Sequence, residues 1–86
     1  MTAKPVKLYA LSTCGHCKNT RKLLDQHQVA YDCVEVDLSF GEEREKLVAE
    51  VKKFNPACSF PTLVIGEGEK VIVGFRENEI KETLGL

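Results

Sequence analysis

The chain has 86 residues, a length that suits one small domain, and we expect residues 1–86 to form a single domain. Hydrophobic residues make up 43% of the chain and charged residues 29%, which is typical of a globular protein and excludes a disordered one. There are 12 basic and 13 acidic residues, and the net charge of −1 leaves no basic excess for binding nucleic acid or an anionic membrane.

The N-terminal residues contain no apolar run long enough for a signal peptide or a membrane span, so we expect a cytoplasmic protein. In that reducing compartment, the four cysteines of the chain are not expected to form a disulfide framework. A close pair of cysteines there indicates redox or metal chemistry.

The first predicted strand is a nearly continuous apolar run at residues 6–11. Thr13 is placed to cap a helix that starts at or just after Cys14. The buried face of that helix is predicted by apolar and small residues at helical spacing: Cys17, Thr20, Leu23, Leu24 and His27.

A second strand is predicted at residues 31–36, which are rich in β-forming residues. Ser39 and Glu42 have the spacing of a capping box at the start of a second helix, and Asn55-Pro56 is expected to end it. The expected buried stripe of this helix is Leu47, Val48, Val51 and Phe54.

The last third of the chain predicts a β-hairpin at residues 62–65 and 70–73, followed by a short helix at residues 78–84. The resulting order is βαβαββα. A helical connection makes the first two strands parallel with a right-handed crossover, and the hairpin makes the last two antiparallel. The predicted fold class is therefore α/β, with a four-stranded mixed sheet and helices on both faces.

The run Cys14-Gly15-His16-Cys17 places two thiols within one turn of the first helix. A protein dithiol reduces a disulfide when one thiolate attacks it and a second thiol resolves the mixed disulfide. Because Cys14 falls at the helix N-terminus, free N–H groups and the helix dipole favour its thiolate. We therefore expect Cys14 to be the nucleophile and Cys17 the resolving thiol.

Two alternatives to this interpretation stay open. His16 has two interpretations: a partly protonated imidazole that stabilises the Cys14 thiolate, or a solvated helix residue without a role. The cysteine pair could also belong to a metal or iron–sulfur binding module. A closed zinc site needs four ligands, and the other candidates (Cys33, Cys58, His16 and His27) contain no second close pair.

The motif Cys14-x-x-Cys17 after a first strand, followed by Lys18, resembles the active site of the glutaredoxin and thioredoxin superfamily. Ser59-Phe60-Pro61-Thr62 is similar to its cis-proline element, and the element order is that of glutaredoxins. The resemblance covers essentially the whole chain. It implies a thioredoxin-like fold, protein-disulfide oxidoreductase activity, no cofactor and a monomer.

The resemblance also implies that Pro61 is cis and faces the Cys14 sulfur, with the backbone of Phe60 free to pair with an extended substrate. Spacing alone leaves an ordinary trans proline as the alternative. The partners it implies are disulfide-containing client proteins, with glutathione as a co-substrate or thioredoxin reductase as the electron donor.

Which donor is used depends on the run Gly74-Phe75-Arg76-Glu77-Asn78. Glutathione-using glutaredoxins hold the γ-glutamyl end with a Gly-Gly-x-Asp-Asp loop; Gly74 matches it, Phe75 departs from it, and Glu77 and Asn78 could replace the acidic pair. Leu11 stands where those proteins commonly place a lysine that binds a glutathione carboxylate. The Gly-Phe-Arg run instead resembles redoxins that serve ribonucleotide reductase and are reduced by thioredoxin reductase.

Three further residues receive weaker expectations. Cys33 is expected to be a buried apolar residue. Cys58 is expected to be a free loop thiol, with a mixed disulfide to glutathione or a regulatory bond as the alternative. Asp37, which follows the second strand, could orient a loop or pair with a basic residue, and it receives no catalytic role.

Overall fold

The computed structural model describes residues 5–86, so the first four residues of the N-terminal stretch, for which no signal peptide was expected, lie outside the described residues. The elements are β1 (Val6–Ala10), α1 (Gly15–Gln26), β2 (Asp32–Glu35), η1 (Val36–Leu38), α2 (Gly41–Phe54), β3 (Thr62–Ile65), η2 (Gly66–Gly68), β4 (Lys70–Val73) and α3 (Glu77–Leu84). The predicted order βαβαββα is confirmed, with η1 and η2 as additional short 3₁₀ turns. No helix within residues 5–86 is long and apolar enough to cross a membrane.

The four strands form one sheet in the order β2-β1-β3-β4. β1 is parallel to β2 and antiparallel to β3, which is antiparallel to β4, so the predicted mixed sheet is confirmed. Thr62 at the start of β3 lies opposite Tyr9 of β1 and Val73 of β4. The segments that follow β1, precede β3 and follow β4 therefore emerge at the same edge of the sheet.

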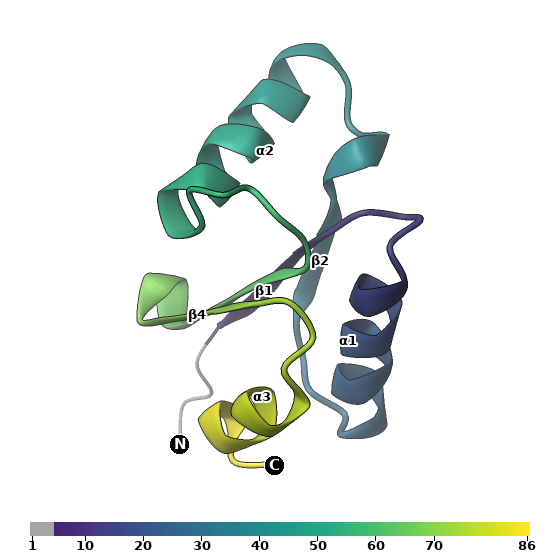
Figure 1. The fold of residues 1–86 in the computed structure, drawn as a ribbon, viewed down its shortest axis with the longest axis vertical. Coiled ribbons are helices and arrows are strands. Elements are labelled where there is room, and N and C mark those ends of the chain that lie inside the picture. The colour runs from purple at the N-terminus through teal and green to yellow at the C-terminus, as the bar shows by residue number, and fades with distance from the viewer. Residues whose placement is uncertain (1–4) are drawn as a thin grey trace.

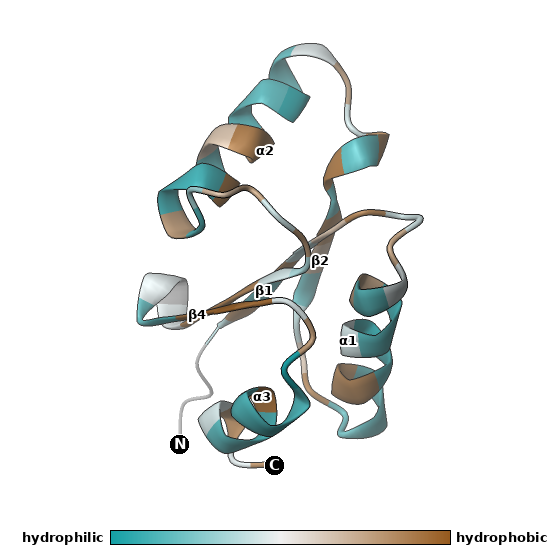
Figure 2. Ribbon diagram, viewed as in Figure 1, coloured by the Kyte–Doolittle hydropathy of each residue, from teal (hydrophilic) through white to brown (hydrophobic). Residues whose placement is uncertain are grey.

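The helices cover both faces of the sheet, with α1 and α3 on one face and α2 on the other (Figure 1). β1 and β4 are largely apolar, whereas β2 contains polar residues and the helices are mostly polar with short apolar stretches (Figure 2). Each face has its own hydrophobic core. The α1-side core includes Leu8, Cys17, Leu24, Leu63, Ile72 and Ile80, and the α2-side core is formed by Tyr9, Val36, Val51 and Val64.

The helix α1 begins just after Cys14, as predicted, but its N-cap residue and its end differ from the prediction. Thr13 lies inside a turn closed by the hydrogen bond from the Cys14 N–H to the Leu11 carbonyl (3.2 Å), so it cannot cap the helix. Cys14 itself occupies the N-cap position. At the other end, His27 is an exposed C-cap residue rather than part of the buried face. The first residue of the cysteine motif therefore caps the helix.

The capping box predicted for α2 is wrong. The Ser39 N–H donates to the Val36 carbonyl (3.2 Å) and ends η1, so Ser39 is already used by the preceding turn. Phe40 takes the N-cap position and makes no side-chain capping hydrogen bond. Other predictions for α2 are confirmed, because Asn55 is its C-cap and Leu47, Val48, Val51 and Phe54 face the α2-side core.

Candidate active site

Three segments that are distant in sequence meet at the edge of the sheet where α1 begins. The Gly74 N–H donates to the Pro61 carbonyl (2.9 Å) and joins the segment after β4 to the segment before β3. Cys14, Phe60 and Phe75 all pack against the α1-side core. The structure thus brings the cysteine motif close to the two other segments that the sequence singled out.

Cys14 is half-buried, and its sulfur caps α1. Its Sγ accepts a hydrogen bond from the Cys17 N–H (3.3 Å), in the way that serine or aspartate oxygen usually does at this position. A charged acceptor forms a stronger hydrogen bond than a neutral one. The Cys17 N–H is therefore a backbone donor placed at the sulfur that would attack a disulfide in its thiolate form.

Cys17 lies beneath this sulfur and has a different environment. Its side chain is 1% exposed. Burial, followed by the hydrogen bond to the Cys14 sulfur, raises the pKa of Cys17 to about 12, although the Leu11 backbone opposes the shift. At neutral pH Cys17 is therefore a protonated thiol that is held next to the accessible sulfur.

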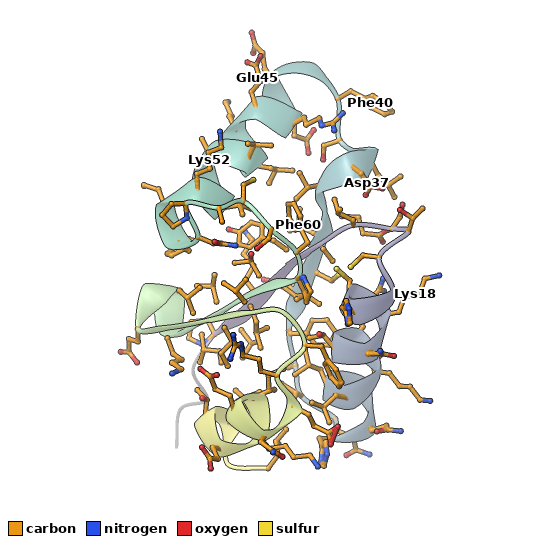
Figure 3. The ribbon with its side chains drawn as sticks, in the orientation of Figure 1. Lys18, Asp37, Phe40, Glu45, Lys52 and Phe60 are labelled. Atoms are coloured by element: carbon orange, nitrogen blue, oxygen red, sulfur yellow. The ribbon has the colours of Figure 1, made fainter. Side chains whose placement is uncertain are left out.

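The middle and following residues of the motif face solvent. His16 is exposed in the first turn of α1, and its carbonyl accepts a hydrogen bond from the Thr20 hydroxyl (2.9 Å). Lys18 is also exposed, and its side chain extends away from the body of the molecule (Figure 3). Solvent therefore surrounds the His16 side chain that the sequence proposed as a partner for Cys14.

The Phe60–Pro61 peptide bond is cis, as the family resemblance implied. Pro61 is buried, whereas Phe60 is half-buried and packs against both cores. Figure 3 shows Phe60 at the centre of the molecule, between α2 and α3. Within residues 5–86, the Phe60 backbone has no hydrogen-bond partner.

A buried asparagine that the sequence analysis treated only as a helix end organises this loop. Asn55 is 6% exposed, and its Nδ2 donates to the carbonyl and hydroxyl oxygens of Ser59 (both 3.1 Å) and to Thr62 Oγ1 (3.2 Å). Its Oδ1 accepts from the Ala57 N–H (3.2 Å). The Thr62 hydroxyl in turn donates to the Ser59 carbonyl (2.7 Å). Asn55 therefore fixes the segment that carries Pro61.

Asp37 fixes the loop on the other side of the cysteine motif. Its carboxylate accepts two hydrogen bonds from Ser12, one from the backbone N–H (3.0 Å) and one from the hydroxyl (2.6 Å). Figure 3 shows Asp37 beside the loop that leads into α1. The hydroxyl and then the backbone N–H of Ser12 hold the pKa of Asp37 below its ordinary value. Asp37 therefore orients a loop, one of the two roles expected for it, but no local pattern indicated its partner Ser12, which is 25 positions away.

This contact makes a prediction about acid stability. The lowered pKa means that the folded state favours ionised Asp37, so its stabilisation is present above the ordinary aspartate pKa and is lost as the pH falls below it. We expect Asp37→Asn to be less stable than wild type at pH 7 and to lose less stability on acidification. Urea unfolding between pH 7 and pH 3 measures this, with exposed Asp32→Asn as the control. An unchanged acid dependence in Asp37→Asn would contradict the assignment.

The segment after β4 contains the other residues that the sequence proposed for substrate binding. Gly74 has a φ of 84°, a left-handed conformation that favours glycine. Phe75 is half-buried, and with Glu77 it lines a hollow of about 380 Å³ beside the middle of α1. Glu77 forms an ion pair with Lys81 (3.2 Å), and Asn78 is exposed. The hollow is therefore beside the later turns of α1, and the Glu77 carboxylate is already paired along α3.

Comparison with known proteins decides the family. The glutaredoxin family model matches residues 6–71, which is more than half of the chain. The chain belongs to the glutaredoxin family. Members of this family are thiol–disulfide oxidoreductases.

Two solved structures show how far the similarity extends. Methanoredoxin of Methanosarcina acetivorans is 45% identical with a TM-score of 0.91, and the match covers 95% of this chain and 85% of that one. The glutaredoxin of Methanosarcina mazei Go1 is 48% identical with a TM-score of 0.88, covering 100% and 85%. Among curated proteins, glutaredoxin 1 of Rickettsia conorii is 33% identical, over 69% of this chain and 60% of its own length. The glutaredoxin fold predicted from the sequence is thus confirmed.

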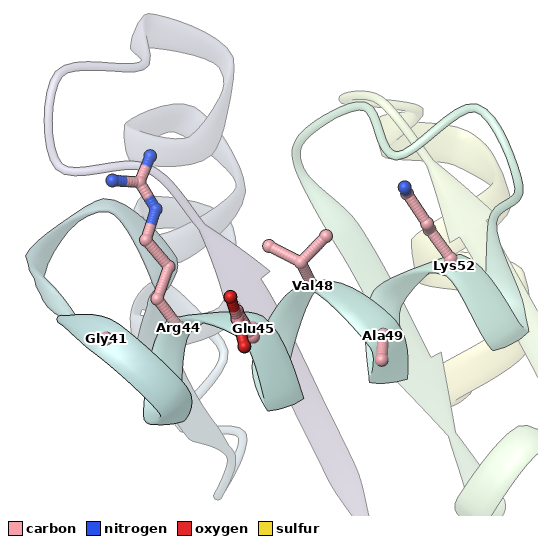
Figure 4. A pocket seen from close by; sticks show the side chains of 6 residues that line it. All are labelled: Gly41, Arg44, Glu45, Val48, Ala49 and Lys52. Carbon is pink, nitrogen blue, oxygen red and sulfur yellow. The ribbon is translucent and has the colours of Figure 1, made fainter.

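Another hollow of this glutaredoxin lies apart from the cysteine pair. It measures about 460 Å³ and is lined by Gly41, Arg44, Glu45, Val48, Ala49 and Lys52, all from α2. Figure 4 shows Arg44, Val48 and Lys52 projecting to the same side of the helix. None of the residues that the sequence proposed for the site lines it. Within the described residues, no three His, Cys, Asp or Glu side chains are arranged to hold a metal ion.

Proposed function

We propose that this glutaredoxin reduces disulfides of client proteins by a dithiol mechanism, with Cys14 as the nucleophile and Cys17 as the resolving thiol. The observation that carries the proposal is the difference between the two sulfurs. The Cys14 sulfur caps a helix and is partly accessible, whereas the Cys17 thiol is buried and protonated beside it. The pair therefore has one sulfur suited to attack the client and one suited to resolve the mixed disulfide.

In the first step, the Cys14 thiolate attacks one sulfur of the client disulfide. The client S–S bond breaks, a bond between Cys14 and the client forms, and the other client sulfur leaves as a thiolate that takes a proton from water. In the second step, Cys17 loses its proton and attacks Cys14 Sγ. The client leaves with two electrons and two protons gained, and a Cys14–Cys17 disulfide remains.

The surroundings of Cys17 suit this order of events. Its hydrogen bond to the Cys14 sulfur and the charge of that sulfur both raise the pKa of Cys17 in the reduced protein. Once Cys14 is bonded to a client, its sulfur no longer carries a negative charge, so the pKa of Cys17 falls. The resolving thiol therefore becomes easier to deprotonate only after the mixed disulfide has formed.

Several residues support a polypeptide as the substrate. The Phe60 backbone has no partner within the described residues, so it is available to pair with an extended client segment, with Pro61 and Gly74 joined beside it. Leu11 packs against the α2-side core and Phe75 against the α1-side core, and neither offers a charge to glutathione. Asn78 remains exposed for a polar contact.

We further propose that the protein acts as a cytoplasmic monomer and that a thiol donor returns the two electrons. The donor is either glutathione or thioredoxin reductase, as the family resemblance implies. Reduction of the oxidised protein by glutathione, compared with reduction by thioredoxin reductase and NADPH, separates the two.

His16 is proposed to stabilise the Cys14 thiolate electrostatically when its imidazole is protonated. We expect His16→Ala to lower the reduction potential by tens of millivolts, because about 30 mV corresponds to 1.4 kcal/mol for a two-electron couple. Redox titration against a glutathione buffer measures the change, with exposed His27→Ala as the control. An unchanged potential would leave His16 as a solvated helix residue.

The proposed function is tested in a single turnover that needs no electron donor. Prereduced protein is mixed with excess oxidised insulin, and thiols on both proteins are counted by alkylation and mass spectrometry. We expect one insulin disulfide to be reduced for each Cys14–Cys17 disulfide formed. Unreduced insulin, with stoichiometric zinc or a cluster chromophore on the purified protein, would instead favour a metal-binding module.

A further inference from the structure

The segment between η1 and α2 presents apolar side chains to solvent. Among the described residues, the exposed large apolar side chains are Leu38 (57% exposed), Phe40 (83%) and Leu86 (41%). Phe40 occupies the N-cap of α2, where a serine or aspartate would have supplied a hydrogen bond, and it supplies none. Neither packing nor capping by the residues that the structure describes explains a phenylalanine at this position.

This segment is fixed next to the cysteine motif. Leu38 follows Asp37, whose carboxylate holds Ser12 through two hydrogen bonds (3.0 and 2.6 Å). Ser12 in turn precedes Cys14 by two residues. Figure 1 shows η1 beside the loop between β1 and α1, and Figure 3 shows Phe40 at the same end of the molecule as Asp37. The contact between Asp37 and Ser12 therefore connects the segment that carries Leu38 and Phe40 to the loop that leads to Cys14.

The charges near Leu38 and Phe40 indicate which kind of molecule would bind there. Between positions 36 and 46 the chain carries four acidic residues and two basic ones, so this segment has a net charge of −2. A negative surface disfavours an anion such as glutathione and favours a segment that carries a positive charge. An exposed aromatic ring favours an apolar side chain.

We propose that Leu38 and Phe40 form a docking rim for the protein client, which binds an apolar side chain flanked by a basic residue next to the reacting cysteine. The inference rests on the proposed function and specifies its substrate class. The two hydrogen bonds between Asp37 and Ser12 hold the docking rim at a fixed position relative to the loop that leads to Cys14. The rim contributes to client binding and leaves the sulfur chemistry unchanged.

The test uses three disulfide-bonded peptides that differ at the residues next to one cysteine. The reference peptide has leucine and lysine there; the second replaces the leucine with serine, and the third replaces the lysine with glutamate. Single-turnover rate constants with the prereduced protein need no electron donor. We expect wild type to react fastest with the reference peptide and the lysine-to-glutamate penalty to shrink at high salt.

We expect Phe40→Ser to lower the single-turnover rate constant with the reference peptide about tenfold. This is the change that one buried aromatic contact typically supplies at an interface. The rate of this variant with the serine peptide stays unchanged. Leu38→Ser acts in the same direction, and Leu86→Ser, which removes an exposed leucine at the C-terminal end, changes neither rate. Circular dichroism and urea midpoints verify that the variants are folded.

The outcomes separate the docking rim from the function. Equal rates for all three peptides with wild type, or equal slowing of the reference and serine peptides by Phe40→Ser, would overturn the docking rim alone. A wild-type protein that reduces none of the peptides would overturn the proposed function itself. If Phe40→Ser does not fold, Leu38→Ser decides the question by the same comparison.

Discussion

Cys14→Ser will abolish disulfide reduction, whereas Cys17→Ser will retain the first step and accumulate a mixed disulfide with the client. In the proposed mechanism the Cys14 sulfur, which caps α1, is the one that attacks, so a serine at this position leaves no nucleophilic thiol at the start of the helix. In Cys17→Ser the attack still occurs, but no thiol lies beneath Cys14 to release the client. The two substitutions therefore stop the reaction on opposite sides of one intermediate.

Non-reducing electrophoresis and intact mass measure this difference after mixing each variant with oxidised insulin. Cys33→Ser and Cys58→Ser are matched controls, because each removes one half-buried thiol outside the motif. Both controls should reduce insulin at rates close to that of wild type. A Cys17→Ser variant that turns over fully with protein disulfides would contradict the dithiol mechanism.

Asn55→Ala will destabilise the protein by about 1–3 kcal/mol, the cost of leaving buried hydrogen-bonding groups without a partner. The substitution removes the donor to Ser59 and Thr62 and the acceptor for Ala57 in one change. Because the same contacts fix the segment that carries Pro61, we also expect a lower kcat/KM with protein disulfides. Stability and activity should therefore fall together.

Urea unfolding gives the stability change, and single-turnover rates at a temperature where both proteins are folded give the activity change. Asn19→Ala is the matched control, since Asn19 is exposed on α1 and alanine favours a helix. If Asn55→Ala unfolds within about 0.5 kcal/mol of wild type, as a typical surface substitution does, the hydrogen bonds of Asn55 are not structural.

Most of the fold was predictable because apolar periodicity is a local property of the chain. The strand at residues 62–65 and the stripe through Val51 were both predicted from local patterns. All four residues of the strand are buried, and the stripe packs against the α2-side core with Val51 fully buried. Helix starts were less predictable. Thr13 and Ser39 have the chemistry of N-caps, but both are used by preceding turns, and a cysteine and a phenylalanine take their places.

The candidate site likewise has features that the sequence predicts and features that it does not. The cysteine pair could be predicted from its spacing, and the cis Phe60–Pro61 bond from the family resemblance, since spacing alone left a trans proline open. The contacts that hold these motifs could not be predicted, since Asp37 binds Ser12 across 25 residues and Asn55 acts through a loop without regular structure. Such contacts depend on where the tertiary fold brings the chain, and local sequence patterns carry no signal for them.

The sulfur that caps α1 links the redox state of the protein to the stability of a helix. In the reduced protein the Cys17 N–H binds a sulfur that can carry a negative charge, whereas in a Cys14–Cys17 disulfide that sulfur is neutral and a weaker acceptor. The stronger cap stabilises the folded dithiol form relative to the folded disulfide form. By a thermodynamic cycle, the same free energy that stabilises the folded dithiol also raises the reduction potential of the pair. Under the proposed dithiol mechanism, the first turn of α1 thereby sets part of the driving force with which the protein accepts electrons from its donor.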